Sequence, residues 1–321
     1  MSCIWLLFSI LYSASFCMNL YANPFLLSSS DYEELQKEMS AKDLSLFVYE
    51  RYPKERKFLD PSLAKPEDFC RRIHKALSHT LIDKEQGLLP TVALMKIGKG
   101  GHRCIVSYAT FNGPYASFLK ELPQKLEDVG FDGYLFYRLG GFPNPTGKEL
   151  RYAGVPYAFK IFCLVEAQSL GFDHVLWIDS AFVPLRDPSP LFVWLENEGS
   201  FTYFRKSYAK YILPKTRELL QQETGVDVLA VPYISAQVLG FTMTKSCVQD
   251  FIREYYRLVE LGTPFLSCFP EEYVFSAIMG KHPEYWKDEP FSDLVVSEEK
   301  LKGRTLTSLK KRGVFFLQKA H

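Results

Sequence analysis

The pattern of hydrophobic and polar positions predicts alternating strands and helices from Arg103 onward. RCIVSYAT is a short apolar, β-rich run, PYASFLKELPQKLEDVG has a helical pattern that ends at Gly130, and GYLFYRL is a second apolar run. After a loop rich in Gly and Pro, PYAFKIFCLVEAQSLG predicts a helix and HVLWID a third strand. These apolar runs are too continuous for a sheet with one solvated face. They therefore predict parallel strands covered by helices on both faces.

The pattern continues less regularly toward the C-terminus. It predicts a short helix near 190–195, a strand at SFTYF, a helix at TRELLQQETG, a strand at AQVLGFTMT, a helix at CVQDFIREYYRLVELG and a further helix from Pro270. The basic stretch KGRTLTSLKKRG is interpreted as a solvated surface or a short strand. We therefore assign residues 101–321 to one α/β domain.

The residues before this domain have a different character. No ionised side chain occurs before Asp31, and the apolar stretch from Ile4 to about Tyr12 is short for a membrane-spanning helix. We expect a signal peptide over residues 1–22, cleaved near Ala22. The alternative is an uncleaved anchor formed by residues 4–20. Residues 23–100 contain polar helical patterns and are expected to form a helical N-terminal extension.

Charge and cysteine content exclude several classes of function. The chain has 321 residues, with 38 basic and 37 acidic side chains, so its net charge is only +1. Such a balance gives no broad basic field for nucleic acid, and membrane contact is expected only through the N-terminal segment if it stays uncleaved. Any anionic ligand must be met by a few local Lys and Arg side chains. The seven cysteines have no CxxC spacing and indicate no disulfide framework.

Polar residues follow two of the predicted strands. Right-handed crossovers bring the carboxyl ends of parallel strands to one edge of the sheet, where α/β proteins bind ligands. Asp179 lies at this edge after HVLWI, and Thr110 and Asn112 follow the first predicted strand. The plain alternative for Asp179 is a carboxylate that caps the next turn through Ser180 and backbone amides. GKGGHR precedes a strand, so it is interpreted as an ordinary loop rather than a phosphate-binding one.

Residues 151–192 combine several of these features in one segment. Pro-Tyr-x-x-Lys opens a helix, and Gly-aromatic-Asp, a strand ending in Trp-Ile-Asp, and Asp-Pro-Ser-Pro-Leu-Phe follow. This segment resembles the nucleotide-diphospho-sugar transferase region of GT-A glycosyltransferases, and AQVLGF and PEEYVFSAI extend the resemblance weakly to about residue 280. The resemblance implies a Rossmann-like, mostly parallel sheet that binds a nucleotide sugar. Asp179 matches the first acid of the family's Asp-x-Asp motif, and Ala181 stands where the second acid would be.

The same resemblance suggests how charge could be supplied to a diphosphate. Asp179, with phosphate oxygens and water, could hold Mn²⁺ or Mg²⁺, although Ala181 removes one ligand. Donor contacts would then come from Thr110, Asn112, Asp179 and Ser180. A basic clamp is the alternative: Arg151 and Lys160 could contact phosphates, as could the Arg-Lys pair at 205–206. A lysine on such an amphipathic helix is, however, usually a surface residue.

Two glutamates are the candidate catalytic residues. In GT-A enzymes that invert configuration, an acid at the start of a comparable helix takes the proton of the acceptor hydroxyl, a role open to Glu271 and Glu272. Pro270 followed by two acids is also what a helix N-terminus favours by itself. Gln237 is a candidate for contacting hydroxyl groups of the acceptor sugar.

Two functions follow as hypotheses. The first is transfer of a sugar from a UDP- or GDP-sugar to a hydroxyl group of a glycan, lipid or protein. The second is a catalytically degenerate exported domain that binds glycan or a protein partner, which Ala181 and the apolar leader favour. A nucleotide-sugar hydrolase on the same fold is a third interpretation.

Overall fold

The structure is a computed structural model that describes the α/β part of the chain. The described residues are 91–111, 114–140, 157–205, 212, 214–261, 263–265, 269–288, 290–291, 294–301 and 305–319. The expected signal peptide and most of the expected helical extension lie outside these residues, as do Asn112 and Arg151.

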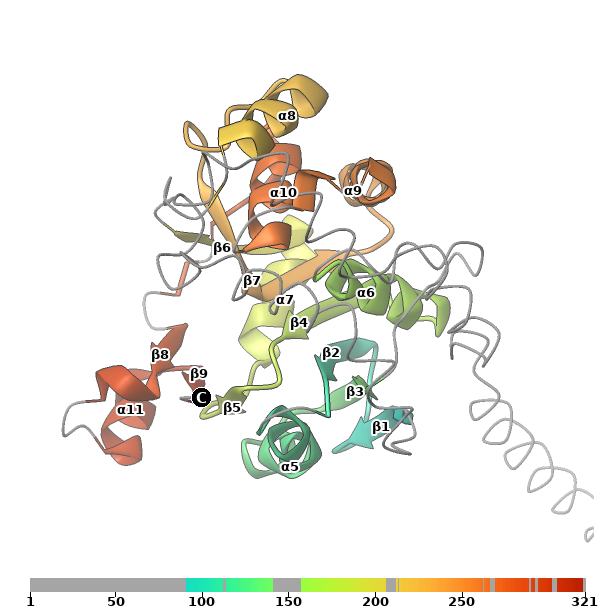
Figure 1. Ribbon diagram of the computed structural model, residues 1–321. Helices are drawn as coiled ribbons and strands as arrows, with labels where there is room; N and C mark the ends of the chain where they lie inside the picture. The colour runs from blue at the N-terminus through green and yellow to red at the C-terminus, as the bar shows by residue number, and fades with distance from the viewer. Residues whose placement is uncertain are drawn as a thin grey trace, which may run out of the picture.

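A six-stranded sheet forms the centre of the protein (Figure 1). Its strand order is β1-β3-β2-β4-β7-β6. Strands β2, β3 and β4 are parallel, whereas β1 is antiparallel to β3, and β7 is antiparallel to both β4 and β6. Four strands thus run in one direction and two in the other. The bounds are β1 Thr91–Ile97, β2 Arg103–Ala109, β3 Gly133–Leu139, β4 His174–Ile178, β6 Ser200–Arg205 and β7 Tyr233–Thr242.

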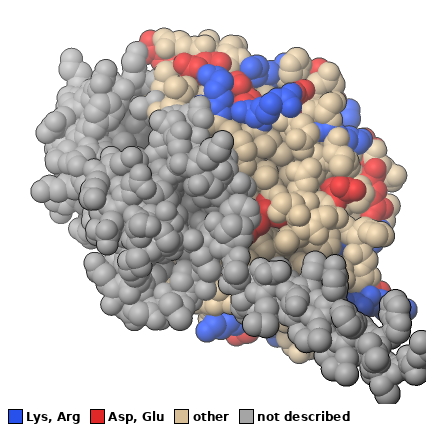
Figure 2. All heavy atoms as spheres, turned by 90° about the vertical axis from the view of Figure 1, so that its right-hand side faces the viewer, with Lys and Arg blue, Asp and Glu red and all other residues tan. Residues whose placement is uncertain are grey.

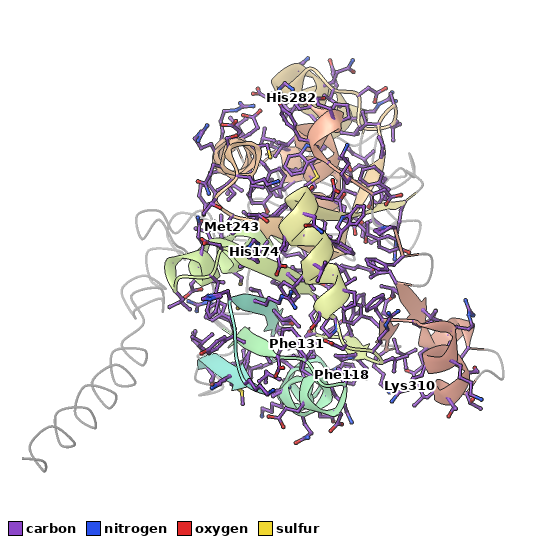
Figure 3. The ribbon with its side chains drawn as sticks, turned by 180° about the vertical axis from the view of Figure 1, so that it is seen from behind. Phe118, Phe131, His174, Met243, His282 and Lys310 are labelled. Carbon is purple, nitrogen blue, oxygen red and sulfur yellow. The ribbon has the colours of Figure 1, made fainter. Side chains whose placement is uncertain are left out.

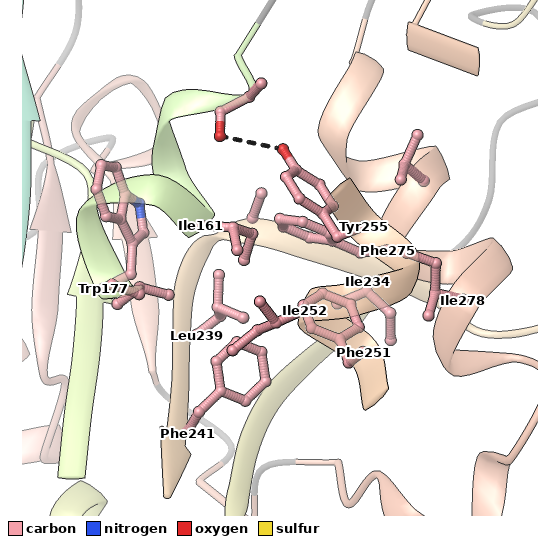
Figure 4. Packing of buried hydrophobic residues seen from close by; sticks show 14 of the residues in the cluster. Ile161, Trp177, Ile234, Leu239, Phe241, Phe251, Ile252, Tyr255, Phe275 and Ile278 are labelled. Atoms are coloured by element: carbon pink, nitrogen blue, oxygen red, sulfur yellow. Dashed lines mark hydrogen bonds between the residues drawn. The ribbon is translucent and has the colours of Figure 1, made fainter. Parts of the chain in front are cut away.

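Helices cover both faces of this sheet, because successive side chains of its strands point to opposite sides. Val175 and Trp177 of β4 belong to one hydrophobic cluster and Leu176 and Ile178 to another. The first cluster includes side chains of α6 (Phe159–Ser169), α9 (Ser246–Leu261) and α10 (Pro270–Met279), part of which Figure 4 shows. The second includes side chains of α5 (Tyr115–Asp128) and α7 (Ser189–Glu198). The expected α/β fold, with a mostly parallel sheet between helices, is confirmed.

A smaller unit lies beside the main sheet at the C-terminal end of the chain. Strands β5 (Phe182–Pro184), β9 (Phe316–Gln318) and β8 (Val295–Ser297) form a three-stranded sheet in the order β5-β9-β8. Helix α11 (Leu306–Arg312) packs on it through Leu309, and Figure 3 shows Lys310 of this helix far from the main sheet. The sequence predicted a surface or a short strand here. The residues form a helix because Thr305 caps its start and Gly313, with φ 81°, ends it.

Strand β1 was not predicted from the sequence. It lies before residue 101, where the α/β domain was expected to start, and pairs with β3 along its full length. Most of its side chains are exposed or half-buried because it is an edge strand, so its apolar periodicity is weak. The sheet therefore includes residues that the sequence assigned to the helical extension. Gly98 and Gly100, both with positive φ, form the turn from β1 to β2, so GKGGHR joins two strands rather than a strand and a helix.

Helix α8 (Pro214–Thr224) and three short 3-10 helices complete the described elements. The 3-10 helices are η5 Thr263–Phe265, η6 Pro283–Tyr285 and η7 Glu298–Lys300. Within the described part of the chain, no helix combines the length and apolar character needed to cross a membrane.

Candidate functional site

The candidate site lies at the carboxyl end of β4, which ends before its neighbours β2 and β7 do. Strand β4 pairs with β7 only from Thr242 to Val238, whereas β6 and β7 continue to pair beyond this point. Asp179, the first residue after β4, donates its backbone N–H to the carbonyl oxygen of Gln237 at 3.0 Å. At the opposite end of β4, His174 and Met243 lie together (Figure 3), and the Met243 N–H donates to the backbone carbonyl oxygen of Asp173. Asp179 is thus at the edge that the sequence analysis predicted.

Two donors hold the carboxylate of Asp179 in place. Its Oδ1 accepts a hydrogen bond from Lys160 Nζ at 3.0 Å and another from Trp177 Nε1 at 2.8 Å. The ammonium of Lys160 also lies 5.6 Å from the centre of the Trp177 ring, which favours the cation in this position. The side chain of Asp179 remains 29% exposed, so ligands can reach it. The turn after β4 is closed by Phe182 N–H on the Asp179 carbonyl, and the carboxylate accepts its hydrogen bonds from Lys160 and Trp177 rather than from amides of this turn.

Lys160 is the centre of a buried charge network. Its ammonium contacts Asp179 Oδ1, Glu271 Oε1 and the carbonyl oxygen of Ala236, each at 3.0 Å. An ammonium has three N–H donors, and here each has an acceptor within the protein. Burial by itself would lower the pKa of Lys160, but the surrounding carboxylates outweigh it and raise this pKa above its ordinary value. The expectation of a surface lysine is wrong. A phosphate would have to replace one of these three acceptors.

Glu271 and Glu272 lie in the first turn of α10, and both are buried. Glu272 Oε1 accepts the backbone N–H of Ala236 at 2.9 Å and Ser235 Oγ at 3.3 Å, and Oε2 accepts the hydroxyl of Tyr233. These bonds fix α10 against β7. Burial raises the pKa of Glu271 to about 7; the charge of Glu272 adds to this rise, and Lys160 opposes it. Their expected catalytic role stays a prediction.

A second basic group lies on the exposed side of the site. Arg205, the last residue of β6, donates from Nη2 to Gln237 Oε1 at 2.7 Å. Its guanidinium also lies 4.7 Å from the centre of the Tyr203 ring. Gln237 therefore links Arg205, through its side chain, to Asp179, through its backbone. Position 206, the other half of the predicted basic pair, lies outside the described residues.

Aromatic side chains extend from the charge network along α6. Tyr157 lies two residues before the first residue of this helix, has φ 61° and is 47% exposed. Its ring centre lies 5.9 Å from that of Phe159, which in turn lies 6.1 Å from Trp177. Tyr115, at the start of α5, has a raised pKa because of burial and the negative charge of Asp179. Sequence reasoning did not select either tyrosine, and a Pro-Tyr pair at each helix start was the only available signal.

The remaining predicted donor residues are placed only in part. Thr110 follows β2 at the same edge and is half-buried, and Ser180 is buried in the turn after Asp179. Asn112 and Arg151 lie outside the described residues. The structure therefore brings together Lys160, Asp179 and Glu271, with the backbone of Gln237 alongside.

The contacts of the Asp179 carboxylate do not fit a divalent metal ion at Oδ1. Its Oδ1 already faces an ammonium and an indole N–H, and a hard cation needs oxygen ligands without an opposing positive charge. Ala181 is buried, and its carbonyl oxygen accepts Lys319 N–H at 2.9 Å. Over the described ranges, no group of three or more His, Cys, Asp or Glu side chains is arranged to hold a metal.

Comparison with known proteins found similarity in structure alone. No protein-family model and no curated protein matches the sequence. Similar solved structures include a galactosyltransferase, LgtC, in complex with donor and acceptor sugar analogues (14% identity, 68% of this chain and 87% of that chain, TM-score 0.40). Others are a glycosyltransferase involved in glycosylation of the major capsid of PBCV-1 (14%, 67% and 92%, TM-score 0.41) and mouse xyloside xylosyltransferase 1 (9%, 67% and 97%, TM-score 0.42). Similarity this weak assigns no activity to this chain.

Proposed function

We propose that this chain is a GT-A-like glycosyltransferase that moves a sugar from a UDP- or GDP-sugar to a hydroxyl group of a glycan, lipid or protein. The observation that carries the proposal is Asp179, a partly exposed carboxylate held rigidly at the carboxyl edge of an α/β sheet. Ligands of such sheets bind at this edge. The resemblance of residues 151–192 to the donor-binding region of GT-A enzymes supports the same assignment.

The chemistry of the site suits a ligand rich in hydroxyl groups. A carboxylate has about four acceptor positions, and two donors on Oδ1 leave capacity for the hydroxyls of a ribose or a sugar. Because Lys160 and Trp177 fix the carboxylate before binding, little conformational entropy is lost when such hydrogen bonds form. We assign Asp179 to the donor, with Thr110 and Ser180 beside it, and Gln237 to the acceptor.

A catalytically inactive binding domain is the second candidate function. Its support is the burial of Glu271 and Glu272, whose carboxylates already have partners in Lys160 and in β7. A general base must come within hydrogen-bond reach of the hydroxyl that it deprotonates. Ala181, in place of a second acid, points the same way.

Calorimetry with the full-length protein tests donor binding. A panel of UDP- and GDP-sugars is titrated into the wild type, Asp179→Asn and the control Asp128→Asn, which alters an exposed residue of α5. We expect one donor to bind, with affinity reduced about tenfold or more in Asp179→Asn only, since hydrogen bonds to a charged group contribute roughly 1.5–3 kcal/mol. Absence of binding to every donor would contradict the enzyme proposal. Breakdown of the nucleotide sugar in the absence of any acceptor would identify a hydrolase instead.

We also propose that the protein is exported through its apolar leader, with cleavage near Ala22. The support is the uncharged sequence before Asp31. An exported transferase must work where nucleotide sugars occur, which includes secretory organelles and the cytosol of a host cell. Mass spectrometry of the mature N-terminus tests cleavage, and an intact Met1 would instead support the anchor formed by residues 4–20.

A further inference from the structure

We propose that Arg205, rather than a divalent metal, meets the diphosphate of the ligand, and that Lys160 is an internal cation that only positions Asp179. This inference rests on the proposed function for the identity of the ligand, a nucleoside diphosphate or its sugar ester. Lys160, on α6, would hold Asp179 in position, and Arg205, on β6, would bind the diphosphate.

The charge of Lys160 is already balanced within the protein. Its ammonium is buried and contacts Asp179, Glu271 and the carbonyl oxygen of Ala236. To bind a phosphate directly, it would have to give up the Asp179 carboxylate, the Ala236 carbonyl oxygen or the buried Glu271 carboxylate, and each loss is costly. Lys160 therefore keeps Asp179 in position and occupies the place next to Oδ1 that a metal ligated by this oxygen would need.

Arg205, in contrast, has a charge that no carboxylate balances in the described part of the chain. Its two contacts are with neutral groups, the amide oxygen of Gln237 and the ring of Tyr203. These contacts orient the guanidinium and use one of its five N–H donors. The residue is exposed, so the remaining donors can reach a ligand. A planar guanidinium with free donors is well suited to bidentate binding of phosphate.

The position of Arg205 relative to Asp179 fits an elongated ligand with both hydroxyl groups and phosphates. Gln237 binds Arg205 through its side chain and Asp179 through its backbone, so the two charged residues flank one residue of β7. A ribose or sugar beside Asp179 would place its phosphates toward the basic side of the site. The second acid that Ala181 replaces is then unnecessary, because the charge of the leaving diphosphate is met by a fixed cation.

Calorimetry with UDP and GDP on the full-length protein tests the inference. Each nucleotide is titrated in EDTA and again in Mn²⁺, into the wild type, Arg205→Gln and Arg253→Gln; the control Arg253 is an arginine of α9 with a 71% exposed side chain. We expect one nucleotide to bind equally well in EDTA and Mn²⁺. Arg205→Gln should weaken this binding about tenfold or more and reduce its salt dependence, and Arg253→Gln should change neither. Circular dichroism should show that all three proteins are folded.

Two results would overturn the inference while leaving the proposed function intact. One is binding of a nucleotide only when Mn²⁺ is present, and the other is unchanged affinity in Arg205→Gln. Inorganic pyrophosphate, titrated in parallel, separates the two proposals. If pyrophosphate binds through Arg205 but neither nucleotide does, the anion site stands and the proposed donor is wrong. If neither pyrophosphate nor nucleotide binds under any condition, both proposals are wrong.

Discussion

Replacement of Lys160 by methionine should destabilise the protein by an amount that increases with pH. The substitution removes the ammonium from contact with Asp179, Glu271 and the Ala236 carbonyl while keeping most of the side-chain volume. Below about pH 6, Glu271 is largely protonated in the wild type, because burial raises its pKa to about 7. In that range the cost is the loss of hydrogen bonds from a charged donor, about 2–3 kcal/mol of unfolding free energy.

Above pH 7 the two proteins should diverge. The wild type can ionise Glu271 because Lys160 compensates the charge, although its raised pKa already makes stability fall as pH rises through about 7. Without Lys160 the pKa of Glu271 in the folded state rises further. The folded variant therefore keeps this carboxyl protonated at pH values where the unfolded chain has lost the proton, and this lowers its stability as the pH increases. Each pH unit between the two pKa values adds about 1.4 kcal/mol. The difference in unfolding free energy should therefore increase by up to about 2 kcal/mol between pH 7 and 8.5.

Denaturant titrations of the wild type and Lys160→Met at pH 6, 7, 8 and 8.5 measure this difference. Lys120→Met, at an exposed position of α5, is the matched control and should change stability little at any pH. Adding Glu271→Gln to Lys160→Met should abolish the increase with pH, because the amide does not titrate. A difference for Lys160→Met that stays constant from pH 6 to 8.5 would refute the assigned coupling between Lys160 and Glu271.

Three further substitutions test the packing around the sheet by the same denaturant titrations. Glu166→Leu should lower the unfolding free energy by about 3–5 kcal/mol, because it leaves the fully buried guanidinium of Arg138 without its bidentate partner. Adding Arg138→Met should restore most of this stability. A double variant as unstable as Glu166→Leu alone would contradict the assigned ion pair. Gly133→Ala should lower the unfolding free energy by about 1–3 kcal/mol, since its Cβ would lie 2.8 Å from a backbone carbonyl oxygen. In the control Gly101→Ala the new Cβ meets nothing within 4 Å, so stability should not change. Equal losses of stability in the two variants would be inconsistent with this packing. Trp177→Phe should cost about 2 kcal/mol through loss of its indole donor, and a neutral result would argue against that hydrogen bond.

The sequence predicted the parallel core of the fold because its strands are buried on both faces. HVLWI and RCIVSYA read as continuous apolar runs, and they form β4 and β2 at the centre of the sheet. Strand β1 escaped prediction because an edge strand with exposed side chains lacks that signal. Helix α11 escaped because its seven residues carry little periodicity, and only its Thr305 and Gly313 boundaries mark it. Local pattern therefore predicts central elements better than edges.

The sequence pointed to several residues that the structure places close together, but not to the network that joins them. The position of Asp179 at the carboxyl edge of the sheet was predicted correctly, because right-handed crossovers bring the carboxyl ends of parallel strands to one edge. The contacts of Lys160 with Glu271 and Ala236 join elements that are distant in sequence, so no local pattern of residues predicts them. Burial reversed the expectation for Lys160 in particular: the same position on an amphipathic helix is exposed or buried according to what packs against it.

Transfer of a sugar to an acceptor is the decisive assay for the proposed glycosyltransferase activity. The full-length protein is incubated with the nucleotide sugar that binds in calorimetry and with a panel of glycan, lipid and peptide acceptors. The masses of the products are then measured by mass spectrometry. We expect one acceptor to gain the mass of one sugar residue, with an equal amount of nucleoside diphosphate released, and Asp179→Asn to abolish both. A protein that binds the donor but leaves every acceptor unmodified and the donor intact would contradict the enzyme proposal and favour the binding domain.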